Sequence, residues 1–147
     1  MLSLSNIGEY MEVEFNIDGD IFLATLLESD APKSTKAFLS LLPLKSKLFH
    51  VRWSGFAVWI DIDDSNMPEL PHENHTVYPS IGDILLYPGF SSVKEILISC
   101  GPTCFKSTAG ELAGNHIATL DASRNELIEL ELSSLEGGAK PISVYKK

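Results

Sequence analysis

The residues best suited to chemistry lie in two short alternating segments within residues 48–60. The segments are joined by Ser54-Gly55, a pair typical of a tight hairpin turn. A two-residue turn at this point places His50 opposite Trp59 and puts Arg52 on the same face. A guanidinium beside an indole either packs against it through a cation–π contact or binds a carboxylate or amide oxygen of a ligand. This face is therefore a candidate binding surface.

The same turn predicts an apolar face on the other side of the hairpin. That face would hold Phe49, Val51, Trp53, Phe56, Val58 and Ile60. Such a division into an apolar face and a polar face is expected for a hairpin that packs one face against a core, since the pairing register decides on which face each side chain lies.

A second pair of candidate residues lies further along the chain. Glu111 and His116 could form an acid–base pair, because a carboxylate orients an imidazole ring and raises its basicity. The alternative is that His116, which follows a glycine and opens a strand, is hydrogen-bonded to loop carbonyls. The sequence alone leaves both interpretations open.

Other reactive residue types form no recognisable site. Cys100 and Cys104 lack the paired spacings of structural zinc modules, so reduced, buried thiols are expected. The acidic stretch 61–75 begins like a calcium loop but lacks the central glycine and the terminal glutamate, and His72 and His75 within it are expected to be solvated. Ser107 lacks a nucleophile elbow. The sequence predicts no metal and no cofactor.

Composition restricts the class of protein. The 147 residues, 44% of them hydrophobic, suit one compact domain over 1–147. The 20 acidic and 11 basic residues give a formal net charge of -9, which opposes binding to nucleic acid or anionic lipid. The N-terminus has neither a basic region nor a sustained apolar run, and no later run is long enough for a membrane span. A cytoplasmic location is expected.

The pattern of the remaining chain predicts a mainly β fold. Alternation predicts a hairpin over 11–28 with its turn at Asp18-Gly19, and Asp30 and Pro32 begin a helix over about 31–42. Further strands are expected at 84–88, 95–101, 116–120, 127–132 and 141–145, and residues 102–114 form a loop that could include a second short helix. About eight strands with one main helix predict a closed antiparallel β-barrel, with the helix over one end.

Several segments resemble cyclophilins. Residues 26–38 look like their second strand and first helix, and Phe49-His50 with Gly55-Phe56 resembles their central hairpin. Residues 111–116 and 139–144 are similar to their Trp-Leu-Asp-Gly-Lys-His segment and closing strand. More specifically, the chain resembles a small prokaryotic cyclophilin-like family without an established function, on four motifs: His50-x-Arg-Trp-Ser-Gly, Glu73-Asn74, residues 82–89 and Gly114-Asn-His116.

The resemblance also implies a site. Cyclophilins use an outward arginine, a neighbouring glutamine and an apolar pocket for the prolyl ring. An ungapped match puts Val51 at the position of the cyclophilin arginine. If the turn is shorter by one residue, Arg52 takes that position instead. Trp59 then lies opposite the expected cyclophilin glutamine, and Ala57 lies where a methionine is expected. The other matched positions are Tyr87–Gly89 in place of Met-Ala-Asn, Glu111 in place of the tryptophan, and His116 at the site histidine.

Three functions follow as hypotheses. The first is binding of a small carboxylate- or amide-bearing molecule, or of a short peptide, on the outer barrel face. Its residues would be His50, Arg52, Trp59, Tyr87, Glu111 and His116. The second is prolyl isomerisation assisted by Arg52 and weakened by the missing glutamine. The third is small-molecule hydrolysis or isomerisation by Glu111 and His116. Separately, the sequence leaves open whether the protein forms a homodimer.

Overall fold

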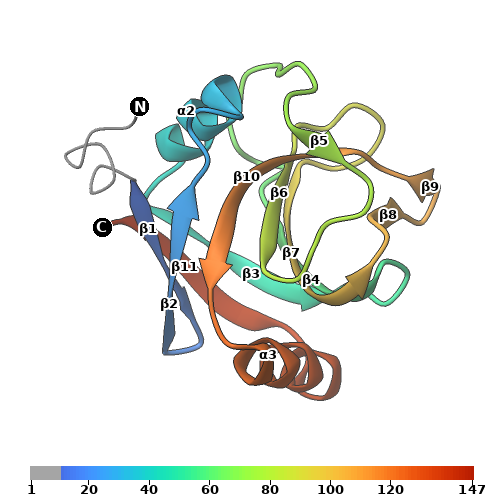
Figure 1. Cartoon of the computed structure of the whole chain (residues 1–147). Coiled ribbons are helices and arrows are strands. Elements are labelled where there is room, and N and C mark those ends of the chain that lie inside the picture. Colours follow the sequence, from blue (N-terminus) through green and yellow to red (C-terminus); the bar gives the residue numbers. More distant parts are fainter. Residues whose placement is uncertain (1–10) are drawn as a thin grey trace, which may run out of the picture.

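Eight antiparallel strands close into a barrel in the computed structural model, which describes residues 11–147. The order around the barrel is β2-β1-β11-β3-β4-β7-β6-β10, and β10 pairs with β2 to close it (Figure 1). The strands are β1 Glu12–Ile17, β2 Asp20–Leu26, β3 Leu44–His50, β4 Gly55–Asp61, β6 Asp83–Tyr87, β7 Glu95–Thr103, β10 Gly114–Asp121 and β11 Lys140–Lys146. Three two-residue strands, β5 His75–Thr76, β8 Lys106–Ser107 and β9 Gly110–Glu111, lie in the connections. The predicted mainly β, closed antiparallel barrel is confirmed.

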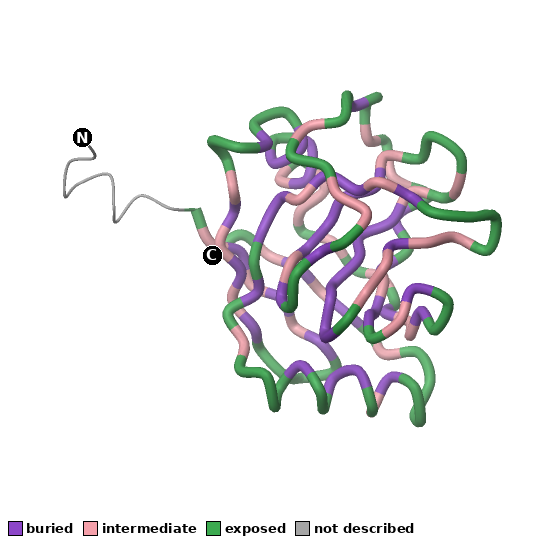
Figure 2. Tube along the Cα trace, turned by 45° about the vertical axis from the view of Figure 1, so that its right-hand side comes forward, coloured by how far each residue is buried: buried purple, intermediate pink, exposed green. Residues whose placement is uncertain are grey.

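Two helices cover opposite ends of the barrel (Figure 1). Helix α2 spans Pro32–Ser40 within the predicted range, and its Phe38 stacks on Phe15 of β1 with ring centroids 6.3 Å apart. Helix α3 spans Arg124–Gly137 and contributes Leu127 and Leu130 to the barrel core. In Figure 2 many of the buried positions follow the strands, while each turn of α3 is buried on the side toward the barrel and exposed on the other side.

The strand predicted over 127–132 is wrong, because this segment lies inside α3. Its start is fixed by a capping box, in which Ser123 Oγ accepts from Glu126 N and Glu126 Oε1 accepts from Ser123 N. Apolar residues alternate with glutamates over 128–132, which suggests a strand, but the buried residues Leu127, Leu130 and Ser134 recur at helical spacing. The short helix considered within 102–114 is likewise absent from that segment, which forms β8 and β9.

The start of α2 also differs from the prediction. Ala31 is its N-cap residue and no side chain caps it locally, so Asp30 does not have the expected role. Glu73 acts instead from the long loop, since its Oε1 accepts a hydrogen bond from Ser34 N at 2.5 Å. A carboxylate at this position satisfies a free amide of the first turn and interacts favourably with the helix dipole.

The central hairpin has a different register from the predicted one. Strands β3 and β4 pair Phe49 with Trp59 and His50 with Val58, so His50 and Trp59 lie on opposite faces. The connection consists of two overlapping turns. Ser54 N donates to Val51 O in the first, and Gly55 N donates to Arg52 O in the second. This loop shifts the pairing by one residue, and such a shift exchanges the two faces of a strand.

The predicted apolar face is consequently split. Val58 and Ile60 join the barrel core, whereas Val51 belongs to a separate cluster on the outer face. Phe49 packs on Trp59 outside the barrel. Trp53 and Phe56 are half exposed near the turn.

Candidate functional site

The outer face of strands β4, β7 and β6 carries a second, smaller apolar cluster. It consists of Val51, Ala57, Leu85, Tyr87, Leu97, Phe105 and Leu112, with Trp59 packed against it. Phe105 and Leu112 come from the connection between β7 and β10, which folds back over the sheet. Cys104 N donates to Ser54 O and attaches the connection to the β3–β4 turn, while Leu112 N donates to Phe105 O within the connection, both at 2.9 Å.

A cavity of about 390 Å³ opens at one side of this cluster. Its volume lies within the usual range for small-molecule sites. Three segments that are distant in the sequence form it. The lining residues are Pro71, His72, Tyr87, Phe90, Ser91, Glu111, Leu112 and Ala113.

Aromatic rings in perpendicular contact dominate this cavity. The Phe90 ring meets His72 edge-on with centroids 4.9 Å apart and meets Tyr87 at 6.1 Å. Tyr87 in turn meets Phe105 at 5.8 Å, and His72 stacks on His75 at 4.5 Å. Edge-to-face contacts of this kind are favourable for aromatic quadrupoles and hold the rings at fixed angles.

Hydrogen bonds fix the two loops that carry these rings. Ser91 N donates to the Tyr87 hydroxyl at 2.8 Å, which closes the loop that bears Phe90. On the other side, fully buried Asn115 of β10 holds the loop around His72. Its Nδ2 donates to Pro71 O at 3.0 Å and its Oδ1 accepts from Glu73 N at 3.2 Å. Both cavity walls are therefore held by residues of the barrel strands, in addition to the ring contact between Phe90 and His72.

The electrostatic character of the cavity comes from Glu111 at its rim. Among residues 11–147, no lysine or arginine lines this cavity. Cys104 Sγ lies 3.8 Å from Glu111 Oε1, and the negative charge of Glu111, followed by Cys104, raises the pKa of exposed Tyr78. A ligand group that donates N–H or carries positive charge is favoured next to this carboxylate, and an anionic group is opposed.

The cavity brings together two of the six predicted ligand-binding residues, Tyr87 and Glu111. Trp59 lies on the same outer face but is part of the cluster floor beside Phe49, 5.2 Å away. Arg52 is exposed in the β3–β4 turn and does not line the cavity.

The two remaining predicted residues have other partners. His50 Nε2 lies 3.0 Å from Glu131 Oε2 under α3, so it faces away from Trp59. His116 Nε2 lies 3.1 Å from Asp83 Oδ1 and 3.0 Å from the Ala118 carbonyl oxygen. The ring therefore contacts Asp83 and a strand carbonyl rather than Glu111.

The register explains why Trp59 and His116 do not meet. Trp59 pairs with Leu97, Leu97 with Leu85, and Leu85 with His116, so all four lie in one row on the outer face. Three strand spacings separate the ends of this row, which is about 14 Å. A ligand in the cavity would not span both residues.

His72, Phe90 and Leu112 are cavity residues that the sequence did not single out as a site. His72 was expected to be solvated, and no spacing connects it with Phe90 or Leu112. The one local signal was Gly89, whose φ of +92° allows the sharp turn that directs Phe90 back over Tyr87.

The described residues give no sign of a metal centre or a membrane span. No group of three His, Cys, Asp or Glu residues within 11–147 is arranged to hold a metal ion. No helix in this part of the chain is long and apolar enough to cross a bilayer. Cys100 and Cys104 are both free thiols, and burial followed by the charge of Glu131 raises the pKa of Cys100 to about 12.

A closed barrel with two end helices and an apolar outer-face site defines a cyclophilin-like protein. The profile of the family described as "Protein of unknown function (DUF3830)" matches residues 15–145, and the chain belongs to this family. The expected resemblance to a cyclophilin-like family is thereby confirmed. No curated protein matches the chain.

Solved structures show the same fold at low sequence identity. McbB in complex with tryptophan has a TM-score of 0.73 and 16% identity, over 92% of this chain and 44% of McbB. The chain therefore spans less than half the length of McbB. The hypothetical protein AF2241 from Archaeoglobus fulgidus has a TM-score of 0.61 and 19% identity, over 94% of this chain and 95% of AF2241. A cyclophilin-type peptidyl-prolyl cis-trans isomerase from Cryptosporidium parvum has a TM-score of 0.58 and 16% identity, over 94% and 99% of the two chains.

Proposed function

We propose that this protein binds a small molecule that combines an aromatic or flat apolar group with an amide or amine. The site is the outer-face cavity, and the observation that carries the proposal is the aromatic enclosure formed by His72, Tyr87 and Phe90 beside the carboxylate of Glu111. The aromatic walls supply apolar contact area, and the single carboxylate orients the ligand.

The position of Glu111 decides which polar groups suit the site. The sequence by itself is compatible with carboxylate or amide ligands, with Arg52 as the group that binds them. Because Arg52 does not line the cavity and Glu111 does, the amide or amine alternative is favoured over the carboxylate. A hydrogen bond from a ligand N–H to a carboxylate is stronger than one between neutral groups.

Two structures with the same fold suggest test ligands. One is McbB in complex with tryptophan, a molecule with an indole and an amine. The other is the Cryptosporidium parvum isomerase, whose structure was also determined in the presence of the dipeptide Ala-Pro. At 16% identity these complexes support the choice of test ligands and nothing finer.

The test is calorimetric titration with tryptophanamide, tryptophan, indole-3-acetate and the dipeptide Ala-Pro. At about 0.3 kcal/mol for each of about fifteen non-hydrogen atoms, tryptophanamide should bind with a dissociation constant of roughly 0.5 mM. Tryptophan should bind more weakly and indole-3-acetate most weakly, because their carboxylates approach Glu111. Stronger binding of indole-3-acetate than of tryptophanamide would reject the assigned polarity.

Two variants locate the binding. Phe90→Ala should weaken tryptophanamide binding at least fivefold, and Phe56→Ala is a matched control, since the two rings are 55% and 52% exposed. Glu111→Gln should reduce the preference for tryptophanamide over indole-3-acetate by roughly tenfold, about 1.4 kcal/mol. Equal effects of Phe90→Ala and Phe56→Ala would contradict a site in this cavity.

Prolyl isomerisation has less support as a second function. An arginine that donates to the prolyl nitrogen would have to reach the apolar pocket, and Arg52 lies in the β3–β4 turn outside it. Hydrolysis or isomerisation by a Glu111–His116 pair lacks the required contact, since His116 contacts Asp83. Ala-Pro binding that depends on Arg52, together with isomerase activity, would reverse this order.

A further inference from the structure

The outer-face cavity contains a right-angled corner between two aromatic rings. The planes of His72 and Phe90 make an angle of 88°, and their centroids are 4.9 Å apart. In a perpendicular pair the edge of one ring points at the face of the other, so the two faces enclose a corner. His75 stacks on one face of His72, and the second face forms the corner with Phe90. A compact, rounded group in this corner contacts two ring faces at once, whereas a flat group contacts only one.

The rings of this corner are accessible from outside. His72 is exposed, and Phe90 is 55% exposed in the loop after β6. Tyr87 meets Phe90 at 83°, but it is only 2% exposed and contributes little free ring surface. The corner between His72 and Phe90 is therefore the part of the cavity in which a ligand gains most contact with ring faces.

The electrostatic surroundings of this corner favour a cation. Aromatic faces attract positive charge through the ring quadrupole, and Glu111 at the rim adds the charge of a carboxylate. No lysine or arginine of residues 11–147 lines the cavity. The formal net charge of the whole chain is -9. A cation is therefore favoured here over a neutral group of the same shape.

Two hydrogen-bond acceptors in the cavity wall already have donors. The Tyr87 hydroxyl accepts from Ser91 N at 2.8 Å, and Pro71 O accepts from Asn115 Nδ2 at 3.0 Å. A primary ammonium brings three N–H donors, and a donor that loses water without gaining an acceptor is unfavourable. A fully methylated ammonium has no N–H group and avoids this loss. The cavity therefore favours a methylated ammonium over a primary one.

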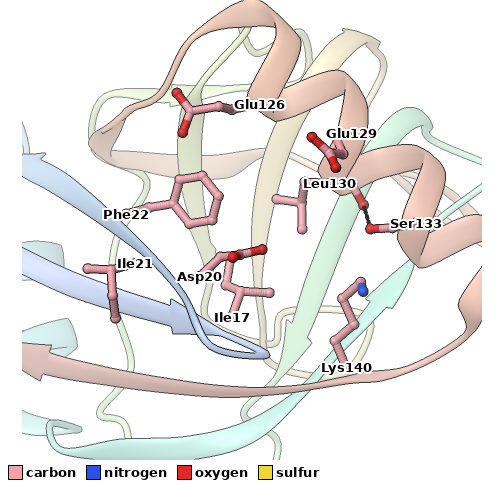
Figure 3. Close-up of a pocket in the computed structure, with 9 residues that line it drawn as sticks. All are labelled: Ile17, Asp20, Ile21, Phe22, Glu126, Glu129, Leu130, Ser133 and Lys140. Carbon is pink, nitrogen blue, oxygen red and sulfur yellow. Dashed lines mark hydrogen bonds between the residues drawn. The ribbon is translucent and has the colours of Figure 1, made fainter.

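A groove elsewhere on the barrel has negative charge without such a corner (Figure 3). It lies between α3, the β1–β2 hairpin and the start of β11, and its volume of about 380 Å³ is close to that of the outer-face cavity. Its lining includes the carboxylates of Asp20, Glu126 and Glu129 as well as Lys140. Phe22 is the one aromatic residue among the described residues of this lining. This groove, called the α3 groove below, is therefore a comparison site in the same molecule for binding by charge alone.

We propose that the ligand of the outer-face cavity carries a methylated ammonium group, which lies in the corner between His72 and Phe90. The charge of Glu111 stabilises this cation from the rim, and the apolar remainder of the ligand lies over Leu112. The inference rests on the proposed small-molecule function of the cavity. It adds the chemical class of the ligand amine, which is a methylated ammonium rather than a primary amine or a neutral amide.

The test compares three small ligands by NMR titration of the full chain at pH 8. They are choline, ethanolamine, and dimethylbutanol, the uncharged analogue of choline in which carbon replaces the nitrogen. Choline should bind in the millimolar range and roughly tenfold more tightly than dimethylbutanol, because only the cation is attracted by the ring faces and the carboxylate. Ethanolamine should bind roughly threefold more weakly than choline, because its N–H donors lose water.

Two of the possible orders would overturn the proposal. Equal binding of choline and dimethylbutanol would show that charge is not recognised. Tighter binding of ethanolamine than of choline would show that the site recognises N–H donors and not a methylated group.

A conservative variant separates ring contact from apolar contact. Phe90→Leu keeps an apolar side chain but removes the ring face, so it should weaken choline binding roughly fivefold and leave dimethylbutanol binding nearly unchanged. Phe56→Leu is the matched control, because Phe56 is 52% exposed and does not line the cavity. An equal loss of choline binding in both variants would contradict the ring corner.

Carboxylate variants separate this cavity from the α3 groove. Glu111→Gln should weaken choline binding roughly fivefold, because the nearby negative charge is removed. Glu129→Gln makes the same change in the α3 groove and should leave choline binding unchanged. A larger loss with Glu129→Gln than with Glu111→Gln would place the cation in the α3 groove and overturn the proposal.

The outcomes also distinguish this inference from the proposed function. Tryptophanamide binding that depends on Phe90, together with equal binding of choline and dimethylbutanol, would leave the small-molecule site in place and reject the methylated ammonium. Absence of binding of both tryptophanamide and choline would reject the two proposals together.

Discussion

Glu95 is a buried acid whose ionisation is linked to folding. It begins β7, is 6% exposed, and is placed by the register between Tyr87 and Asp61. Burial, followed by repulsion from Asp61, raises the pKa of Glu95 to about 8. The carboxyl is therefore mainly protonated at neutral pH in the folded chain, whereas in the unfolded chain it titrates near its ordinary value.

This linkage predicts how stability changes with pH. Between about pH 4.5 and pH 8 the folded chain holds a proton on Glu95 that the unfolded chain has released, so the Glu95 contribution to the free energy of unfolding falls as pH rises, by at most about 1.4 kcal/mol per pH unit. Glu95→Gln removes this dependence. Urea denaturation at pH 5, 6.5 and 8 should show the variant gaining stability over the original chain as pH rises.

The control for Glu95 is Glu69→Gln, at an exposed loop position. It should follow the original pH dependence. A Glu95→Gln variant with the same slope as the original chain would show that the folded protein leaves Glu95 ionised.

At the scale of elements, the loop before β5 connects α2 with the outer-face cavity. Glu73 caps α2 through Ser34 N, while Asn115 donates to Ser34 Oγ at 2.8 Å and holds the loop at Pro71. The buried side-chain amide of Asn115 thus connects the start of α2, strand β10 and the cavity wall at Pro71. The position of His72 depends on this joint rather than on the local sequence of the loop.

Removing the cap should have a measurable cost. Glu73→Ala leaves Ser34 N without an acceptor and should lower the free energy of unfolding by about 1 kcal/mol, as other N-cap losses do. It should also weaken tryptophanamide binding, because the loop that carries His72 loses one attachment. Glu69→Ala in the same loop should change neither quantity, and an equal effect of the two variants in urea denaturation would contradict the assigned cap.

At the scale of the whole molecule, α3 is attached to the barrel by a polar pair as well as by apolar packing. His50 and Glu131 are almost completely buried and lie 3.0 Å apart, and His50 Nδ1 is buried without a partner among the described residues. Buried polar pairs contribute little net stability, but removing one member leaves the other unsatisfied.

This asymmetry makes a double-mutant prediction. Glu131→Ala should lower the free energy of unfolding by about 2–4 kcal/mol, and replacing both residues by leucine should recover most of that loss. Chemical denaturation measures both. Glu129→Ala, two positions along α3 and exposed, should have little effect. A double-leucine variant no more stable than Glu131→Ala would show that the pair is required for the docking of α3.

The sequence by itself determined the elements whose signals are local. Strict alternation around Asp18-Gly19 predicted the β1–β2 hairpin, whose turn has φ values of 52° and 96° at these two residues. Pro32 predicted the start of α2 because proline is tolerated in the first turn of a helix. These patterns, with the strand count, were sufficient for the closed antiparallel barrel, whereas its cyclophilin-like class followed from the motif resemblance.

Only the tertiary structure decided the register of β3 and β4, the helical state of 124–137 and the composition of the cavity. A loop one residue different from the predicted turn moves His50 to the inner face of β3 while Trp59 stays on the outer face of β4, and packing against neighbouring strands and α3 selects between such registers. The cavity joins His72, Phe90 and Glu111 through strand pairing and the Asn115 hydrogen bonds. Contacts between segments so distant in the chain leave no periodic signal, so barrel closure was predictable and the composition of the cavity was not.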